Sequence, residues 1–372
     1  MAAGGTAGHV VPAIAVAAEL RASGAEVSFL GTRERIEAEL VPAAGYEIDF
    51  IKVRGIDRRN PLRAAAAAAE AVGAIGSASR AIHARRADVV LGGGGFVAGP
   101  AGMAAAMRRT PLVLTEADSH LGLANRLLAG RAKRVCLAFP IAGRDGGRYV
   151  VTGRPVPDAV LHANREQARR RFHIDADARC LLVMGGSQGA RSINLAAIEA
   201  FAEGADGGAR EFNVIHLAGR RDYEELKQRL AAAPAHERYT LLAYEPNLGD
   251  VLGASDLVLA RSGGSLFEVT AAGRPAILVP YPHATADHQS ANAAWMARAG
   301  AAEVVEDATL SGELLAQRVG GLLADETRLA TMSAASAALA RPDAARTIAD
   351  EVLAAACGAP YPPIEGERRT GT

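Results

Sequence analysis

The sequence is poor in cysteine and in aromatic residues, and it carries no excess charge of either sign. Three cysteines are spread over 372 residues without a CxxC pair, which excludes a disulfide framework and a cysteine-rich zinc site. The 41 basic residues equal the 41 acidic residues, so no overall field attracts nucleic acid, and we expect no nucleic-acid partner. No stretch approaches the ~20 apolar residues that cross a bilayer, and no signal-peptide pattern opens the chain. These absences predict a cytosolic protein, at most peripheral on a membrane.

Short apolar runs alternate with longer alanine-rich segments along the whole chain. This alternation is typical of parallel β-sheets covered by helices on both faces, and the length suits two domains. In the first half we expect strands at 26–31, 87–93, 111–115, 134–138 and 148–153. In the second half we expect them at CLLVMGG, FNVIHLAG, YTLLAY, DLVLARSGG, PAILVPY and AAEVVE.

Glycine-rich loops occur twice in each half, in the same order. AAGGTAG at 2–8 resembles VMGGSQG at 183–189, and VLGGGGF at 90–96 is matched by LARSGGS at 259–265. This internal repeat predicts two doubly wound domains of similar construction. Because ligands of such sheets bind at the carboxyl ends of the strands, we expect the domains to face one cleft lined by four glycine loops.

Proline-rich and alanine-rich segments set the expected boundaries. Two prolines in VTGRPVPDAV, at 151–160, mark the linker between domains at 1–153 and 154–342. The segment 61–86 reads as one long helix. We expect a helix at 343–356 to pack back on the N-terminal domain, and a disordered tail at 357–372.

The first glycine loop lies unusually close to the start of the sequence. Its counterpart follows a buried strand, but only MAA precedes GGTAG. Either the chain as given begins several residues late, or the sheet lacks most of its first strand. We favour the late start, because an open slot would leave backbone groups unpaired.

Glycine loops that precede helices suit a pyrophosphate, because backbone N–H groups and the positive helix end face the ligand. None of the loops matches GxGxxG or the P-loop pattern, so each taken alone reads equally well as a tight turn. Four such loops in register indicate a phosphate-binding cleft.

His9 directly follows the first loop. A position at a helix N-terminus lowers the pKa of an imidazole and favours the neutral form that a general base requires. The alternative is a histidine that bonds to local backbone at a helix start.

Two other groups have competing interpretations. Ser265 and Glu268 fit a capping box, in which each satisfies a backbone donor of the other, but Glu268 also suits the vicinal hydroxyls of a ribose. The segment PHATADHQSAN at 282–292 contains two histidines and an aspartate, but their spacing matches no metal-ligand pattern. We therefore expect no metal there, and favour sugar recognition.

The motifs together resemble those of one family. GGTAGHVVPAIAVA, GGGGFVAGPA, LGLANRLLA, VTGRPVP, LLVMGGSQGARSIN and SGGSLFEVTAAGRPAILVPYPHATADHQSANA are similar to the motifs of the MurG family, over residues 4–356. These bacterial hexosyltransferases transfer N-acetylglucosamine (GlcNAc) to lipid I, undecaprenyl-pyrophosphoryl-muramoyl-pentapeptide, and so form lipid II for peptidoglycan. The resemblance implies a glycosyltransferase-B fold with the acceptor in the N-terminal domain and UDP-GlcNAc in the C-terminal one. It implies no obligatory cofactor.

The resemblance also implies residue roles. His9 would be the catalytic base, with Glu116 as the second candidate. Contacts to UDP-GlcNAc would come from Thr6, Ala7, Gly8, Asp118, Arg154, Ser187, Gln188, Gly263, Gly264, Ser265, Leu266, Glu268 at the ribose and Gln289 at the GlcNAc hydroxyls. The loops at the acceptor diphosphate would include Gly5, Gly94 and Gly95.

The sequence departs from the family pattern at several positions. Ala7 replaces a glycine, so the turn must accommodate a Cβ, and Pro157 replaces an arginine for which Arg154 could substitute. Asp118 stands where an asparagine is expected; it cannot donate a hydrogen bond when ionised and would repel a diphosphate. These departures leave two alternatives open: a related glycosyltransferase with another lipid or polyketide acceptor or another UDP-sugar, and a non-catalytic UDP-sugar-binding protein.

The implied reaction is an inverting single displacement by the muramoyl 4-hydroxyl, with UDP stabilised by loop amides. A lipid acceptor implies a peripheral location on the cytoplasmic face of the cell membrane. The basic segment 52–63, KVRGIDRRNPLR, suits anionic headgroups there, and equally suits a solvated loop.

Overall fold

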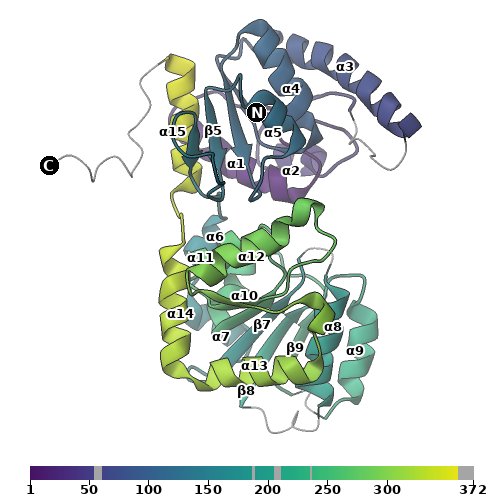
Figure 1. The fold of residues 1–372 in the computed structure, drawn as a ribbon, viewed down its shortest axis with the longest axis vertical. Helices are drawn as coiled ribbons and strands as arrows, with labels where there is room; N and C mark the ends of the chain where they lie inside the picture. Colours follow the sequence, from purple (N-terminus) through teal and green to yellow (C-terminus); the bar gives the residue numbers. More distant parts are fainter. Residues whose placement is uncertain (54–60, 187–188, 205–210, 235–236, 359–372) are drawn as a thin grey trace, which may run out of the picture. The chain divides into compact units, whose positions relative to one another are not determined.

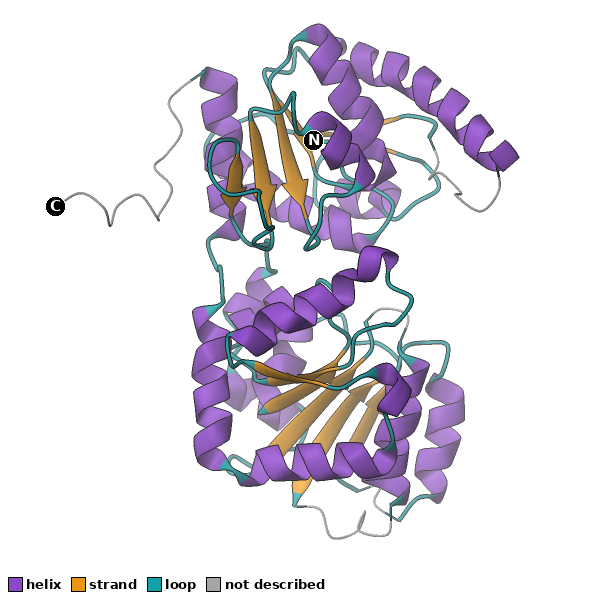
Figure 2. Cartoon of the chain, viewed as in Figure 1, coloured by secondary structure: helices purple, strands orange, loops and turns teal. Residues whose placement is uncertain are grey.

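The chain divides into two compact units in a computed structural model (Figure 1). The structure describes residues 1–53, 61–186, 189–204, 211–234 and 237–358; the side chains of 61–69 and of Thr285 are not described. Unit 1 comprises Met1–Pro155 and the chain from Arg341 onward, and unit 2 comprises Val156–Ala340. Each unit is an α/β domain in which helices flank a parallel sheet (Figure 2).

Unit 1 is built on parallel strands whose central members are fully buried. The strands are β1 (Ser28–Gly31), β2 (Glu47–Phe50), β3 (Val90–Gly92), β4 (Leu112–Glu116), β5 (Arg134–Leu137) and β6 (Tyr149–Val151). The helices are α1 (Ala7–Ala22), α2 (Glu37–Ala43), α3 (Pro61–Ala84), α4 (Gly95–Arg108), α5 (Leu123–Leu128) and α15 (Ala344–Cys357). β1 pairs with β2, and β3, β4, β5 and β6 pair in that order. The apolar runs form strands here because both faces of the sheet are covered.

The segment Met1–Ala3 joins these two groups of strands. Ala2 forms parallel bridges with both Leu30 and Gly92. Its N–H donates to the carbonyl of Leu91 at 2.8 Å, and its carbonyl accepts from the N–H of Gly93 at 2.8 Å. The slot in front of the first glycine loop is therefore occupied. The resulting order, β2-β1-(1–3)-β3-β4-β5-β6, places the switch point of a doubly wound sheet between residues 1–3 and β3.

The last described helix belongs to unit 1. α15 packs on α1 and β4, and its Ile348 and Val352 share a core cluster with Val16 of α1. A buried ion pair at 2.8 Å joins Arg134 of β5 to Glu351 of α15. The helix ends at Cys357, and the rest of the expected tail, 359–372, lies outside the described residues.

Unit 2 contains a six-stranded parallel sheet of order β12-β11-β10-β7-β8-β9. Its strands are β7 (Arg179–Met184), β8 (Phe212–Leu217), β9 (Tyr239–Leu242), β10 (Leu257–Ala260), β11 (Ala276–Leu278) and β12 (Ala302–Val304). Its α-helices are α6 (Asp158–Leu161), α7 (Arg165–Arg171), α8 (Arg191–Ile198), α9 (Tyr223–Ala232), α10 (Leu248–Ala254), α11 (Leu266–Ala271), α12 (His288–Arg298), α13 (Gly312–Ala324) and α14 (Glu326–Ala338). The π-helix η1 (Glu199–Glu203) continues α8, and the 3-10 turns are η2 (Thr285–Asp287) and η3 (Asp307–Thr309). The switch point lies between β7 and β10.

These observations confirm the expected fold class of two doubly wound α/β domains, and every expected strand is present. The sequence analysis missed β2, whose residues Glu47–Phe50 alternate charged and apolar side chains and are only partly buried. All three cysteines are free thiols. In the part of the chain that the structure describes, no helix is long and apolar enough to span a membrane.

Candidate active site

The first glycine loop of unit 1 is held against a buried carboxylate. Gly5 adopts φ +97°, and its N–H donates to Glu37 Oε2 at 3.0 Å. Oε1 of Glu37 accepts from the N–H and the hydroxyl of Thr32 at 3.1 and 2.7 Å. The sequence analysis did not identify Glu37. The loop therefore has a fixed shape before any ligand binds.

Alanine at position 7, where the family motif has glycine, causes no backbone strain. It is the first residue of α1, and Thr6 occupies the N-cap position with extended backbone. Ala7 is not among the residues with positive φ, and its side chain is exposed. The turn needs no glycine at this point, since its left-handed residue is Gly5.

His9 lies in the first turn of α1 and contacts both glycine loops of unit 1. Its Nδ1 lies 3.1 Å from the Thr6 hydroxyl. The imidazole packs against Gly94, which has φ +92°, and a Cβ on Gly94 would lie 2.5 Å from His9 Cδ2 and 3.1 Å from Nε2. Gly94 is thus required both for the backbone conformation and for the close approach of the ring.

The surroundings of His9 keep its imidazole neutral. Burial lowers the pKa of His9, and the nearby guanidinium of Arg154 lowers it further, while Asp118 opposes them. Arg154 Nη2 donates to the carbonyl of Gly8 at 2.8 Å, which fixes this cation beside the start of α1. Its Nε is buried and has no hydrogen-bond partner among the described residues. An unsatisfied guanidinium N–H beside a helix N-terminus suits an anionic group.

Glu116 organises the loop after β4. Oε1 accepts from the N–H of Asp118 at 3.1 Å. Oε2 accepts from the N–H of Gly122 at 2.7 Å and from Asn125 Nδ2 at 2.9 Å. Burial raises the pKa of Glu116, against the effect of these hydrogen bonds. Both oxygens of Glu116 therefore already accept hydrogen bonds from the protein.

A largely apolar cavity of about 470 Å³ opens beside His9 within unit 1. His9, Gly94, Glu116 and Asp118 line its polar end. The rest of its wall comes from apolar side chains of α3, α4, α5 and the segment before α3, among them Val53, Ile75, Phe96, Met103, Leu123 and Leu127. This cavity can hold a ligand with a polar head and an apolar body.

In unit 2, the loop after β7 approaches the loop after β8 closely. Gly186 and Gly189 adopt φ +84° and +75°, and a Cβ on Gly189 would collide with the carbonyl of Ala218. Asn194 of α8 joins the same two segments, since its Nδ2 donates to the Ala218 carbonyl at 2.8 Å. The expected donor contacts Ser187 and Gln188 lie outside the described residues.

The loop after β10 leads into α11. Ser265 is the N-cap residue, but its side chain forms no cap hydrogen bond, so the serine contribution to the expected capping box is not observed. Glu268 lies in the first turn of α11 and is partly buried. The side chain of Leu266 is completely buried, and its N–H donates to the carbonyl of Gly263 at 3.2 Å. Leu266 therefore shapes the loop from the core.

The structure brings Gln289 beside this loop. The Gln289 carboxamide oxygen accepts from the N–H of Tyr281 at 2.9 Å, and its Nε2 lies 4.0 Å from the Cβ position of Gly263. Ser262 donates to the backbone carbonyl of Gln289 at 2.7 Å, and Asn292 Nδ2 donates to the carbonyl of Ser262 at 3.0 Å. Gln289 and Gly263, both expected to contact the donor, therefore share one side of the loop.

Arg261 is a further residue that the sequence analysis did not identify. Its Nη2 donates to the Ser192 hydroxyl at 2.7 Å, and its Nη1 forms an ion pair with Asp307 at 2.6 Å. The same Nη1 donates to the carbonyls of Val279 and Pro280 at 3.1 Å. Arg261 thus ties together the segments that follow β7, β10 and β11. Arg261 is part of the motif ARSGG, but its partners become apparent only in the folded structure.

The segment 282–292 has an unusual backbone. Ala286 and Asp287 both adopt left-handed conformations, with φ +53° and +52°. Ser290 donates to Asp287 Oδ1 at 2.6 Å. Within the described ranges, no group of three His, Cys, Asp or Glu side chains could hold a metal ion.

Comparisons with known proteins agree with this architecture. Residues 1–137 match the model of the glycosyltransferase family 28 N-terminal domain, and residues 180–348 match that of the family 28 C-terminal domain. The two matched regions contain the glycine loops of unit 1 and of unit 2, respectively.

Similar full-length proteins carry one common name. A Moorella thermoacetica protein is 41% identical over 94% of this chain and 96% of its own length, and a Mycolicibacterium paratuberculosis protein is 40% identical over 95% and 87%. Both are named UDP-N-acetylglucosamine–N-acetylmuramyl-(pentapeptide) pyrophosphoryl-undecaprenol N-acetylglucosamine transferase. The crystal structure of Acinetobacter baumannii MurG matches with a TM-score of 0.77 and 32% identity, covering 95% of this chain and 98% of that one. The chain therefore belongs to glycosyltransferase family 28 and, within it, to the MurG family.

Proposed function

We propose that this protein transfers GlcNAc from UDP-GlcNAc to the muramoyl 4-hydroxyl of lipid I, with inversion, to form lipid II. The observation that carries the proposal is the placement of His9. The His9 imidazole, whose pKa is lowered by burial, lies between two glycine loops and lines an apolar cavity. This arrangement suits an acceptor with a sugar diphosphate head and a lipid tail.

His9 is the proposed base. Its depressed pKa keeps the imidazole unprotonated near neutral pH, so it can accept the proton of the attacking hydroxyl. The Thr6 hydroxyl, 3.1 Å from Nδ1, orients the ring. Nε2 lies on the Gly94 side, at the edge of the cavity, where a substrate hydroxyl could approach.

Arg154 and the start of α1 are proposed to hold a phosphate of one substrate. Arg154 has a buried Nε without a partner among the described residues, and the first turn of α1 directs N–H groups in the same region. Asp118 lines the apolar cavity beside His9, and its charge is opposite to that of Arg154. We infer that Asp118 weakens binding of a diphosphate relative to an asparagine at this position.

Unit 2 is proposed to bind the UDP-sugar. Its two switch-point loops present glycine backbone, and Gln289 lies beside Gly263. The N–H groups of these loops and the start of α11 would stabilise the departing diphosphate. The predicted ribose contact, Glu268, lies in the first turn of that helix.

We infer that unit 1 contacts the cytoplasmic face of the cell membrane, where the lipid acceptor lies. Val72 of α3, Met107 of α4 and Leu127 of α5 are 70, 72 and 64% exposed. Large apolar side chains with this exposure suit a lipid surface. The basic segment 52–63 lies mostly outside the described residues.

The test is acceptor-dependent release of UDP from UDP-GlcNAc with a soluble lipid I analogue. We expect the wild-type protein to turn over and His9→Ala to lose activity by about 10²- to 10⁴-fold, because general base catalysis contributes about that much. Binding of UDP to His9→Ala should be unchanged. Asp118→Asn should bind UDP-GlcNAc more tightly.

Two results would contradict the proposal. Turnover that requires a different lipid or polyketide acceptor, or another UDP-sugar, would identify a related transferase. UDP-GlcNAc binding without turnover for any acceptor would support a binding protein instead.

A further inference from the structure

A second cluster of charged groups lies in unit 2 at the amino ends of β7, β10 and β11. The loops proposed to bind the donor lie at the carboxyl ends of these strands. Asp256 immediately precedes β10, Arg274 lies two positions before the start of β11, and Cys180 is the second residue of β7. Because β11, β10 and β7 are neighbours in the sheet, these residues lie at one edge.

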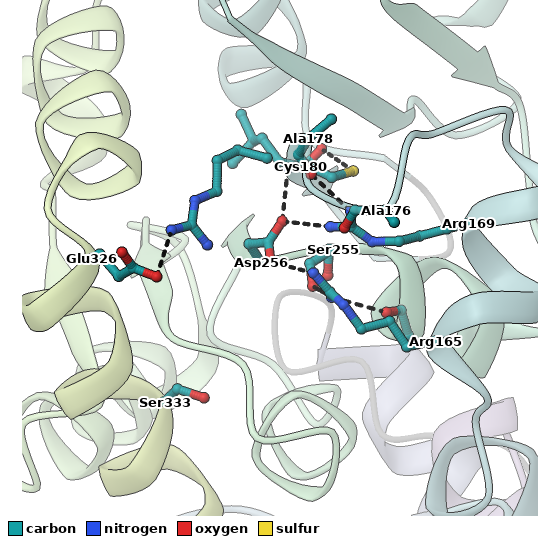
Figure 3. A network of polar contacts seen from close by, with 12 residues as sticks. Arg165, Arg169, Ala176, Ala178, Cys180, Ser255, Asp256, Glu326 and Ser333 are labelled. Carbon is teal, nitrogen blue, oxygen red and sulfur yellow. Dashed lines mark hydrogen bonds and ion pairs between the residues drawn. The ribbon is translucent and has the colours of Figure 1, made fainter.

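Two arginines of α7 share the Asp256 carboxylate (Figure 3). Arg165 Nη2 donates to Oδ1 at 2.6 Å, and Arg169 Nη2 donates to Oδ2 at 2.8 Å. The N–H of Cys180 also donates to Oδ2, at 2.9 Å. The Asp256 and Arg169 side chains are 8 and 5% exposed, whereas that of Arg165 is 39% exposed. The single negative charge of Asp256 therefore neutralises only one of the two positive charges of Arg165 and Arg169.

Arg274 adds a third guanidinium to a cluster that has one buried carboxylate. Burial lowers the pKa of Arg274 to about 10, the nearby cation Arg165 contributes to the decrease, and Asp256 opposes it. Arg274 remains protonated at neutral pH. Its Nε is buried without a hydrogen-bond partner, and in the part of the chain that the structure describes its guanidinium forms no ion pair. A half-buried charge in this state is costly unless something outside the chain pairs with it.

The backbone of Arg274 is fixed by α14. Ser336 donates to the carbonyl of Arg274 at 2.7 Å, and Ser333 donates to that of Gly273 at 2.7 Å. The nearest acidic side chain of α14 in the cluster, Glu326, pairs with Arg179 at 3.6 Å and is 87% exposed. The N–H of Val258 donates to the carbonyl of Pro275 at 3.0 Å, so the backbone of Arg274 lies close to that of Asp256, the partner of Arg165. The cluster keeps an excess of positive charge.

We propose that Arg274 and Arg165 form a binding site for a small tetrahedral oxyanion, such as phosphate, at the amino edge of the unit 2 sheet. Two guanidinium groups that share such an anion convert the repulsion between them into charge-assisted hydrogen bonds. This site differs from the proposed donor site in both location and residue type.

Thermal unfolding in inorganic phosphate and in chloride, at matched pH and ionic strength, tests the proposal. At a phosphate concentration about tenfold above Kd, we expect phosphate to raise the wild-type Tm by about 3 °C relative to chloride. Arg274→Met should lose most of this increase, while being at least as stable as wild type in chloride. Arg274→Lys should retain part of it, because lysine keeps the charge but not the planar set of donors.

The matched control is Arg170→Met. Arg170 lies on α7 close to Arg165 and Arg169, but it is 68% exposed and pairs with Glu166 at 2.5 Å. It should respond to phosphate as the wild type does. Phosphate binding elsewhere, including at the donor loops, is common to all of these proteins and cancels in the comparison. Equal phosphate responses of wild type and Arg274→Met would overturn the proposal. Failure of Arg274→Met to fold would also overturn it, since it would reveal an internal partner for this guanidinium.

Discussion

The two units use the same scaffold but place different chemistry at the same position. The loop GGTAGH of unit 1 corresponds to GGSQGA of unit 2, so His9 corresponds to Ala190. His9 is a partly buried imidazole at the edge of a cavity, whereas Ala190 is 6% exposed and occupies the N-cap position of α8. Both doubly wound domains therefore present backbone N–H groups at the same place. Only the loop of unit 1 adds an ionisable side chain, His9, directly after its last glycine.

The supports of the two loops also differ. In unit 1, Ala2 pairs with both neighbouring strands ahead of the loop, and the Glu37 carboxylate accepts a hydrogen bond from Gly5 within the loop. In unit 2, a six-residue strand precedes the loop, and neutral groups such as Asn194 join it to its neighbour. Residues 1–3 form backbone hydrogen bonds to the neighbouring strand segments on both sides, through Leu30 on one side and Leu91 and Gly93 on the other.

In each unit, one glycine of a loop packs against a backbone carbonyl of the neighbouring loop. Replacing this glycine by alanine should have the largest effect on the free energy of unfolding. Gly95 has φ +73° and packs on the carbonyl of Gly4, and Gly189 has φ +75° and packs on that of Ala218. Gly95→Ala and Gly189→Ala should each lower the free energy of unfolding by about 3 kcal/mol, because backbone strain and a backbone collision add. Urea unfolding of each variant measures this loss.

Helical glycines in open space provide the controls. Gly76 of α3 and Gly320 of α13 have nothing within 4 Å of a Cβ position. Gly76→Ala and Gly320→Ala should stabilise the protein by about 0.5–1 kcal/mol. A similar small gain for Gly95→Ala would show that the two loops of unit 1 are not in contact.

A buried histidine in the core of unit 2 should make the free energy of unfolding decrease at acidic pH. His216 of β8 is completely buried between the Tyr239 hydroxyl, 2.8 Å from Nδ1, and Asn194 Oδ1, 3.0 Å from Nε2, and burial lowers its pKa to about 3. Between pH 3 and the ordinary value of 6.5, the unfolded chain binds a proton here and the folded chain does not. Stability therefore falls as pH falls, by about 1.4 kcal/mol per pH unit from this group.

The variant His216→Gln isolates this contribution. Glutamine cannot titrate, so the pH slope of the free energy of unfolding between pH 6 and pH 4 should become smaller by about one proton. An unchanged slope would mean that acid sensitivity arises from other groups.

Two serines occupy N-cap positions in unit 2, but only one of them forms a capping hydrogen bond. Their substitution has the smallest expected effect on the free energy of unfolding. Ser311 caps α13 by accepting from the N–H of Leu314 at 3.2 Å, whereas Ser265 at the start of α11 makes no cap bond. Ser311→Ala should cost about 1 kcal/mol in the free energy of unfolding, and Ser265→Ala close to zero. An equal cost for both would restore the capping-box interpretation of Ser265 and Glu268.

The sequence predicted the fold because its signals were local. β-branched runs, alanine-rich helices and glycine loops at fixed order specify two doubly wound domains and their switch points. Strand β2 was missed because Glu47 and Asp49 interrupt its apolar pattern, and its side chains are at most partly buried.

The supports of the site could not be predicted in the same way. Glu37 and Arg261 act through partners 32 and 69 residues away in the chain, Gly5 and Ser192 respectively. The excess of positive charge around Arg274 appears only once α7 and the strand edge are assembled. Tertiary placement, not residue type, decides which charged residues are buried.

The pH dependence of kcat/KM for transfer to the lipid I analogue tests the central claim most directly. If neutral His9 is the base, activity rises with pH through the pKa of His9, and this limb should lie below pH 6.5 because burial and Arg154 lower that pKa. Arg154→Met removes a cation and should move the limb to higher pH, whereas Asp118→Asn removes an anion and should move it to lower pH. A limb that does not respond to either substitution, or that shifts in the same direction for both, would contradict His9 as the base.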